Sequence, residues 1–242
     1  MSYLLYCVFR SGPPPEPELP PGIQRTLVSV MDHGGLSAAV AETGHSDPTP
    51  DISAVLAYES VVEFFFRRQT IIPMRYGCRV PDRSGLDAWL GIRHKEHDAL
   101  LSRLDGLAEM GIQIPVKASD ADWSIDSTAV QSAPSHKPMG SGVSYLLAKK
   151  QYYGSADRTA EVRNGLVNTL CQTLSGLFVR HKVEVSCGTA AIVSVYFLLP
   201  RTSVDLFRET ALQRIPKELP KLTVSGPWPP YNFVESSNIS GN

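Results

Sequence analysis

The nine residues Gly226-Pro227-Trp228-Pro229-Pro230-Tyr231-Asn232-Phe233-Val234 say most about how the end of this chain must fold. Their three prolines hold φ at about −65° and each removes a backbone donor. This stretch is therefore not expected to continue a helix or a central strand. The aromatic residues between the prolines carry large apolar surfaces that favour burial. We expect a stiff strap docked on the body of the protein, which either closes the last strand structurally or offers a surface to a partner.

Upstream of the strap, hydrophobic periodicity predicts one compact unit that begins at residue 107. Its segments are a strand over 107–116, helices over 142–153 and 157–178, strands over 182–187 and 190–199, a helix over 203–215 and a strand over 221–225. With its first two helices counted as one crossover, the order matches the split β-α-β pattern of ferredoxin-like sandwiches. A stretch rich in Ser, Asp and Pro over 118–140 is predicted to be a long loop.

The first hundred residues predict a small antiparallel sheet with helices. Strands are expected over 3–9, 25–31, 36–42 and 71–76, and helices over 49–69 and 83–104. Six prolines between Pro13 and Pro21 predict a surface loop, with a proline-recognition ligand as the alternative. The fold class is therefore α+β, with an N-terminal domain over 1–105, a ferredoxin-like domain over 106–225, and a strap and tail over 226–242.

Composition describes an ordinary globular chain of 242 residues, 43% hydrophobic and 19% charged. A formal charge of −1 gives no electrostatic case for nucleic acid or an anionic membrane. The longest apolar run, over 189–199, is too short to span a bilayer, which takes about 20 residues. Four widely spaced cysteines without a C-x-x-C pair predict reduced thiols in a cytoplasmic protein: Cys7, Cys78, Cys171 and Cys187.

The residue types that carry catalysis do not form a complete motif. His94 and His97 lie three apart on a predicted helix and could share a zinc ion, but no third ligand accompanies them. Cys78, close to Arg75, comes nearest to a nucleophile and has no local histidine. Gly140-Ser141-Gly142 lacks the lysine of a phosphate-binding loop. We expect no enzyme, cofactor or metal; an enzyme using His and Cys at a domain cleft, or a ferredoxin-like nucleic-acid-binding module, remains the alternative.

A second short element contains a charged residue, Arg75, near the end of the apolar strand expected over 71–76. Arg75 follows Pro73 and precedes Tyr76-Gly77. An arginine in this position either hydrogen-bonds to carbonyl or carboxylate groups and so holds neighbouring loops, or contacts a partner. Both interpretations stay open from the sequence.

The strap resembles the C-terminal signature of the gas vesicle protein F/L family, and five further elements match that family in order. They are Tyr3-Leu4-Leu5-Tyr6, residues 34–40, residues 71–78, Glu109-Met110-Gly111 and residues 142–146. The resemblance runs from residue 3 to residue 234. It points to the same architecture: a distinct α+β N-terminal half and a ferredoxin-like C-terminal half.

This resemblance implies a non-enzymatic, chaperone-like accessory protein that acts in the nucleation or assembly of gas vesicles, the buoyancy organelles. The implied partners are the small hydrophobic major shell protein and other accessory proteins, and the implied location is the cytoplasm, in association with gas vesicles. Whether the chain is of the F type or the L type stays open. The candidate partner-surface or interdomain residues are Arg75, Tyr76, Gly77, Trp228, Pro229, Tyr231 and Phe233.

Overall fold

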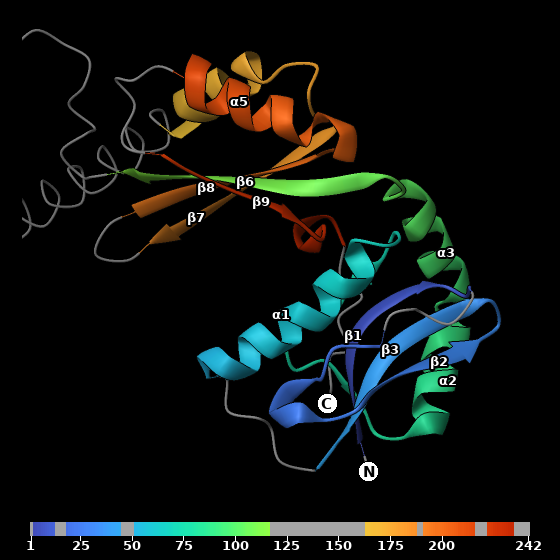
Figure 1. Ribbon diagram of the computed structural model, residues 1–242. Helices are drawn as coiled ribbons and strands as arrows, with labels where there is room; N and C mark the ends of the chain where they lie inside the picture. The colour runs from blue at the N-terminus through green and yellow to red at the C-terminus, as the bar shows by residue number, and fades with distance from the viewer. Residues whose placement is uncertain are drawn as a thin grey trace, which may run out of the picture.

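The computed structural model describes residues 2–12, 18–44, 51–116, 163–187, 191–215 and 222–234, and within them it has two antiparallel sheets with helices (Figure 1). The first sheet contains β1 (Ser2–Arg10), β2 (Val28–His33), β3 (Leu36–Thr43), β4 (Ile72–Pro73) and β5 (Arg79–Val80). Its order is β2-β3-β1-β4, and β5 also pairs with β1. The mixed α/β class expected from the sequence is confirmed.

The first sheet is covered by helices on both faces. Helix α1 (Ile52–Phe66) lies on one face, and α2 (Arg83–Ile92) and α3 (His94–Arg103) lie on the other (Figure 1). Central strand β1 is buried on both sides: Leu4 and Tyr6 pack in the α1 cluster, whereas Leu5 and Val8 pack in the α2–α3 cluster. This explains why β1 is an almost continuous apolar run without a polar face.

Two predictions in the first half need correction. The single helix expected over 83–104 is wrong, because the chain breaks at Arg93 (φ −100°, ψ 10°) between α2 and α3. The break lets Leu90 of α2 and Leu101 of α3 both stay in one buried cluster on the sheet. The strand expected over 71–76 is also too long, since only Ile72–Pro73 pairs with β1 before the chain turns.

Tyr58 fastens α1 to the sheet through a buried hydroxyl. Its Oη lies 2.8 Å from the carbonyl oxygen of Leu5 on β1 and 2.9 Å from that of Met74, just after β4. The phenol can donate its one proton to either carbonyl. Burial, first of all, raises the pKa of Tyr58, so the proton needed for this bond is retained.

We expect Tyr58→Phe to lower the free energy of unfolding by about 1–2 kcal/mol, because two buried carbonyl groups lose their shared donor. Urea unfolding measures the change. Tyr3→Phe is the matched control, since the hydroxyl of Tyr3 bonds to Glu42 at an exposed position and should contribute little. An equal effect of both substitutions would contradict the fastening role of Tyr58.

The second sheet contains β6 (Leu107–Val116), β7 (Arg180–Cys187), β8 (Ala191–Pro200) and β9 (Thr223–Trp228), in the order β7-β8-β6-β9. A helix over 163–173 and α5 (Val204–Arg214) cover one face, and the opposite face turns toward α1 (Figure 1). On the helix-covered face, Met110 of β6 and Phe197 of β8 share a buried cluster with Phe207 of α5. Three short 3-10 turns complete the described structure: Ile23–Arg25, Arg201–Ser203 and Tyr231–Phe233.

The last strand extends further than the sequence predicts. It was expected to end at residue 225, but Gly226, Pro227 and Trp228 still belong to β9. In the described sheet β9 pairs with β6 alone, and such an edge position tolerates a proline that cannot donate. Several predictions lie outside the described residues: the loop over 118–140, the helix over 142–153, the Gly140-Ser141-Gly142 element and Pro13–Pro17 of the proline run.

Candidate partner-binding surface

The Arg75-Tyr76-Gly77 element forms a tight turn after β4. The backbone N–H of Cys78 donates to the carbonyl of Arg75 over 3.1 Å, and Gly77 has φ +85°. A positive φ at the third position of such a turn strongly favours glycine. Arg75 itself is exposed, and its guanidinium forms no hydrogen bond or ion pair with any residue that the structure describes. The structure therefore does not show the Arg75 guanidinium holding neighbouring loops through hydrogen bonds to described residues. Instead, the backbone carbonyl of Arg75 accepts the hydrogen bond from the Cys78 N–H.

Tyr76 turns inward from this element. Its ring packs edge-on against that of Tyr58, with the centroids 5.3 Å apart. Its hydroxyl is buried and has no hydrogen-bond partner among the described residues. Burial, followed by the negative charge of Asp51 at the start of α1, raises the pKa of Tyr76. The turn thus lies beside the N-terminal end of α1.

The strap, residues 226–234, is built into the body of the protein. Pro229 and Pro230 are buried, Phe233 is 5% exposed and Tyr231 is half-buried, whereas Trp228 is 39% exposed. Phe233 shares a cluster with Leu198 of the second sheet and with Leu5 of the first. The expectation of a docked strap holds for all its aromatic residues except Trp228, whose ring lies at the surface.

A buried carboxylate holds the turn of the strap. Glu109 of β6 is only 3% exposed, and it accepts two hydrogen bonds from Asn232: from the backbone N–H over 2.9 Å and from Nδ2 over 2.7 Å. Burial raises the pKa of Glu109 to about 7, although both Asn232 bonds oppose that shift. At the start of the strap, Nη2 of Arg208 donates to the carbonyl of Gly226 over 2.8 Å.

Sequence reasoning did not assign roles to Glu109, Asn232 or Tyr58. The available signal for Glu109 was an acidic residue within the apolar strand over 107–116, which calls for a buried partner. Asn232 lies 123 positions away in the chain, so only the folded structure identifies it as that partner.

Helix α1 connects the two candidate elements. Tyr76 contacts Tyr58 from the side of the turn, and Tyr231 of the strap is close enough to raise the pKa of Tyr58 further. The structure therefore brings Tyr76 and Tyr231 to the same helix, although they are far apart in sequence.

An apolar stripe lies exposed on the N-terminal part of α1. Ile52 is 81% exposed, Val55 43% and Leu56 59%, and their i, i+3, i+4 spacing places them on one side of the helix. An exposed contiguous group of this kind is typical of an interaction surface. We call Ile52, Val55, Leu56, the 75–77 turn and the strap the α1 surface.

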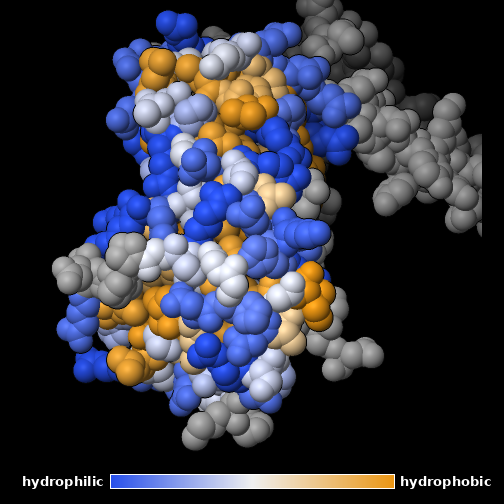
Figure 2. Space-filling model, turned by 90° about the vertical axis from the view of Figure 1, so that its right-hand side faces the viewer, coloured by the Kyte–Doolittle hydropathy of each residue, from blue (hydrophilic) through white to orange (hydrophobic). Residues whose placement is uncertain are grey.

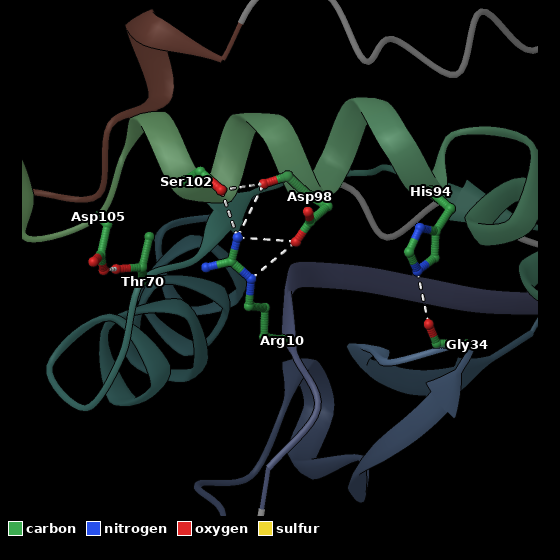
Figure 3. A network of polar contacts seen from close by, with 7 residues as sticks. All are labelled: Arg10, Gly34, Thr70, His94, Asp98, Ser102 and Asp105. Carbon is green, nitrogen blue, oxygen red and sulfur yellow. Dashed lines mark hydrogen bonds and ion pairs between the residues drawn. The ribbon is translucent and has the colours of Figure 1, made fainter.

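The residues considered for catalysis or zinc binding do not converge into a site. Nε2 of His94 lies 2.7 Å from the carbonyl oxygen of Gly34 (Figure 3). His97, in contrast, is fully buried, with its ring 4.7 Å from that of Trp89. Burial lowers the pKa of His97 to about 4 and raises that of Cys78 to about 11. No cluster with three potential metal ligands occurs among the described residues.

The remaining cysteines follow the same pattern as far as they are described. Cys7 and Cys171 are free thiols, and burial raises the pKa of both above the ordinary value. Such thiols are poor nucleophiles at neutral pH. None of the described helices has the length and apolar character required to cross a membrane.

The fold defines a class: a mixed α/β protein with two antiparallel sheets, whose C-terminal strap is an integral part of the structure. A family model described as "Gas vesicle synthesis protein GvpL/GvpF" matches residues 2–235. The chain belongs to this GvpL/GvpF family of gas vesicle proteins.

Characterised relatives agree with the family. The chain is 26% identical to gas vesicle protein F of a Streptomyces species over 97% of this chain and 100% of that protein. It is also 26% identical to gas vesicle protein F2 of Halobacterium salinarum, over 87% of this chain and 81% of that protein.

Two crystal structures share the fold. Gas vesicle protein GvpF of an Anabaena species superposes with a TM-score of 0.78 at 16% identity, covering 98% of this chain and 97% of that one. GvpF of Microcystis aeruginosa gives a TM-score of 0.73 at 14% identity, covering 96% and 98%. These two structures show the shared fold; the family match and the curated relatives confirm the resemblance recognised in the sequence and a role in gas vesicle formation.

Proposed function

We propose that this chain is a non-enzymatic accessory protein of gas vesicle nucleation or assembly that binds the major hydrophobic shell protein. The observation that carries the proposal is the family match over residues 2–235. A shell subunit with a large apolar face aggregates unless another surface covers it. A rigid protein with an exposed apolar stripe is suited to that task, in the cytoplasm where vesicles form, and other accessory proteins are further partners.

The α1 surface is our proposed contact area for the shell protein. It offers three exposed aliphatic side chains on α1, the exposed Arg75 of the turn and the partly exposed ring of Trp228. Tyr76, Tyr231 and Phe233 are too buried for extensive contact, so within this proposal they support the surface from beneath, and Gly77 and Pro229 shape its backbone. This assigns direct contact to fewer candidate residues than the sequence suggested.

We expect Leu56→Ser to weaken capture of the major shell protein about tenfold, because truncating one apolar residue at the centre of an interface costs about 1–2 kcal/mol of binding. Leu212→Ser is the matched control: Leu212 on α5 is 63% exposed, similar to Leu56 at 59%, but lies on the other sheet's helix layer. The measurement is a quantitative pull-down of shell protein by the purified full chain, with a deletion strain complemented by each variant and scored for vesicle formation.

If Leu56→Ser and the control capture equal amounts of shell protein, the α1 surface is not the contact area. If the wild-type chain captures none and the deletion strain still forms normal vesicles, the proposed function itself is wrong. Circular dichroism shows whether each variant keeps its fold, and both substitutions are at exposed sites where little stability should be lost.

We also propose that the chain divides near Asp105-Gly106 into two α+β domains, the second of them ferredoxin-like. Support comes from the order β7-β8-β6-β9, in which β8 lies antiparallel between β6 and β7 as a split β-α-β arrangement requires. The buried cluster that contains Tyr6 also contains Phe197, so residues of both halves contribute to one continuous apolar interior.

A further inference from the structure

A pocket with several arginines in its lining lies between the two sheets, at the other end of α1 from its exposed apolar stripe. Its volume is about 370 Å³, and its lining comes from both halves of the chain: Arg10, Arg68, Gln69, Thr70, Leu101, Asp105, Gly106 and Arg201. Figure 2 shows a molecule narrowed between two lobes, with hydrophilic side chains gathered around this waist. Among the described residues, the lining holds three arginines and one carboxylate, and Asp98 pairs with Arg10 from outside the lining; two negative charges thus accompany three positive ones, and the net charge is positive.

Hydrogen bonds hold each of the three guanidinium groups in place, and each group keeps at least one nitrogen that donates to no described residue. Arg10 of β1 uses Nε and Nη2 on Asp98 and Ser102 of α3 (Figure 3). Its remaining nitrogen, Nη1, points away from Asp98 toward the Thr70–Asp105 pair (Figure 3). No described residue accepts a hydrogen bond from this nitrogen.

The guanidinium groups of the other two arginines lie over aromatic rings. The guanidinium carbon of Arg68 is 3.7 Å from the ring centroid of Phe64, and that of Arg201 is 3.9 Å from the ring centroid of Phe66. Arg68 donates through Nη1 to the carbonyl of Phe64, and Arg201 reaches the carbonyls of Leu107 and Gln69 over 3.4 Å. These ring contacts and hydrogen bonds hold both guanidinium groups in place, and within the described structure each keeps at least one nitrogen that donates no hydrogen bond.

The one carboxylate of the lining does not pair with these arginines, and Asp98, outside the lining, pairs only with Arg10 among them. Asp105 accepts a hydrogen bond from Oγ1 of Thr70 over 2.7 Å and forms no ion pair with an arginine among the described residues. Burial lowers the pKa of Arg201, and the negative charge of Asp105 only opposes that shift. A partly desolvated guanidinium with long hydrogen bonds, such as that of Arg201, is stabilised strongly when an anion binds to it.

We propose that this three-arginine pocket binds an oxyanion, a carboxylate or phosphate group, whose oxygens take the unused donors of Arg10, Arg68 and Arg201. Planar guanidinium forks match the geometry of both groups. Arg10 and Arg68 belong to the first half of the chain and Arg201 to the second, so a bound anion links the two sheets and stabilises their relative position. The inference does not depend on the proposed function.

The test is isothermal titration of the full chain at low ionic strength with two probes: inorganic phosphate, a free anion, and a tetraglutamate peptide, which carries carboxylates on a polypeptide. We expect one of them to bind with 1:1 stoichiometry and to raise the unfolding temperature. The probe with the lower dissociation constant identifies the source of the anion. Binding should weaken with added salt, as ionic contacts at a partly exposed site do.

Arg68→Gln removes one exposed fork and should weaken binding about tenfold, the usual effect of losing a charge-assisted hydrogen bond. Arg67→Gln is the matched control: it removes the same charge one residue away, where Arg67 pairs with Glu63 outside the pocket, and should change binding less than twofold. Arg10→Lys, which keeps the charge but loses the fork, should weaken binding as well. Absence of binding by both probes, or equal losses in Arg68→Gln and Arg67→Gln, would overturn the proposal.

Discussion

Replacing Gly226 by alanine is expected to lower the free energy of unfolding by about 3 kcal/mol, because two separate costs add at this position. Gly226 has φ +108°, a conformation that residues with a side chain rarely adopt. A Cβ atom here would also lie 2.7 Å from the backbone oxygen of Glu109 and 2.8 Å from Sδ of Met110. The first cost is backbone strain, and the second requires β6 and β9 to move apart where the ladder between them is already irregular.

Urea unfolding of Gly226→Ala against wild type measures this effect. The matched control is Gly165→Ala in the helix over 163–173, where an added Cβ meets no atom within 4 Å. That substitution should raise stability by up to about 1 kcal/mol, since alanine favours helices over glycine. A Gly226→Ala protein within about 1 kcal/mol of wild type would show that the strap tolerates displacement from β6, contrary to its tight contact in the structure.

The second large effect concerns the buried carboxylate of Glu109. Its pKa in the folded protein is about 7, above the ordinary value of 4.5, because burial penalises the charged form. The folded state therefore binds this proton more tightly than the unfolded state. The resulting contribution to stability is fully present below about pH 4.5 and is lost as the pH rises through 7.

Glu109→Gln removes the charge and keeps an oxygen that can accept the backbone N–H of Asn232. At pH 8 the variant should be more stable than wild type by about 3 kcal/mol, as expected for a shift of this size at about 1.4 kcal/mol per pKa unit. Near pH 4.5 the two proteins should be nearly equally stable. Urea unfolding at several pH values between 4.5 and 8 gives the difference between them.

The test uses the difference in the free energy of unfolding between variant and wild type at each pH, not either pH curve alone, because His97 contributes a pH dependence of the opposite sign. Burial lowers the pKa of His97 from 6.5 to about 4, so the stability it contributes is present above pH 6.5 and is lost as the pH falls through 4. This term is common to both proteins and cancels. Lys182 and Glu184 of β7 also act on Glu109, with opposite signs.

Glu209→Gln on α5 serves as the control for carboxylate loss, since Glu209 is exposed and bonds only to Gln213 among the described residues. It should change the free energy of unfolding by less than about 0.5 kcal/mol. Parallel pH curves for wild type and Glu109→Gln would contradict a raised pKa for the buried carboxyl group.

Local sequence patterns predicted most elements of the fold where the cause is local. The apolar segment expected over 3–9 is β1, and the neighbouring strands expected over 25–31 and 36–42 correspond to the β2–β3 hairpin. Helix α1 was expected from residue 49, but it begins at Ile52, because the side chain of Asp51 caps it by accepting a hydrogen bond from the Ala54 N–H over 2.7 Å. Periodicity also predicted α5 and both long strands of the second sheet. In each case the determining contacts lie within a few residues of one another.

Predictions failed where distant contacts compete with local preference. The break at Arg93 depends on where the sheet lies beneath α2 and α3, which no window over 83–104 reveals. The extension of β9 to Trp228 depends on β6 leaving an edge free for a strand that contains proline. For the candidate surface, the sequence indicated the turn and the strap but not the exposed aliphatic stripe of α1.

By itself the sequence determined the mixed α/β class, a strap that docks on the protein and the family, since these rest on the hydrophobic period, on proline and glycine chemistry and on ordered short motifs. Only the tertiary structure decided that Glu109 holds Asn232, that Tyr76 and Tyr231 both lie near Tyr58, and that three arginines share one pocket. These groups are distant in the chain, and burial and charge act through space. Only the packed chain brings them within reach of one another.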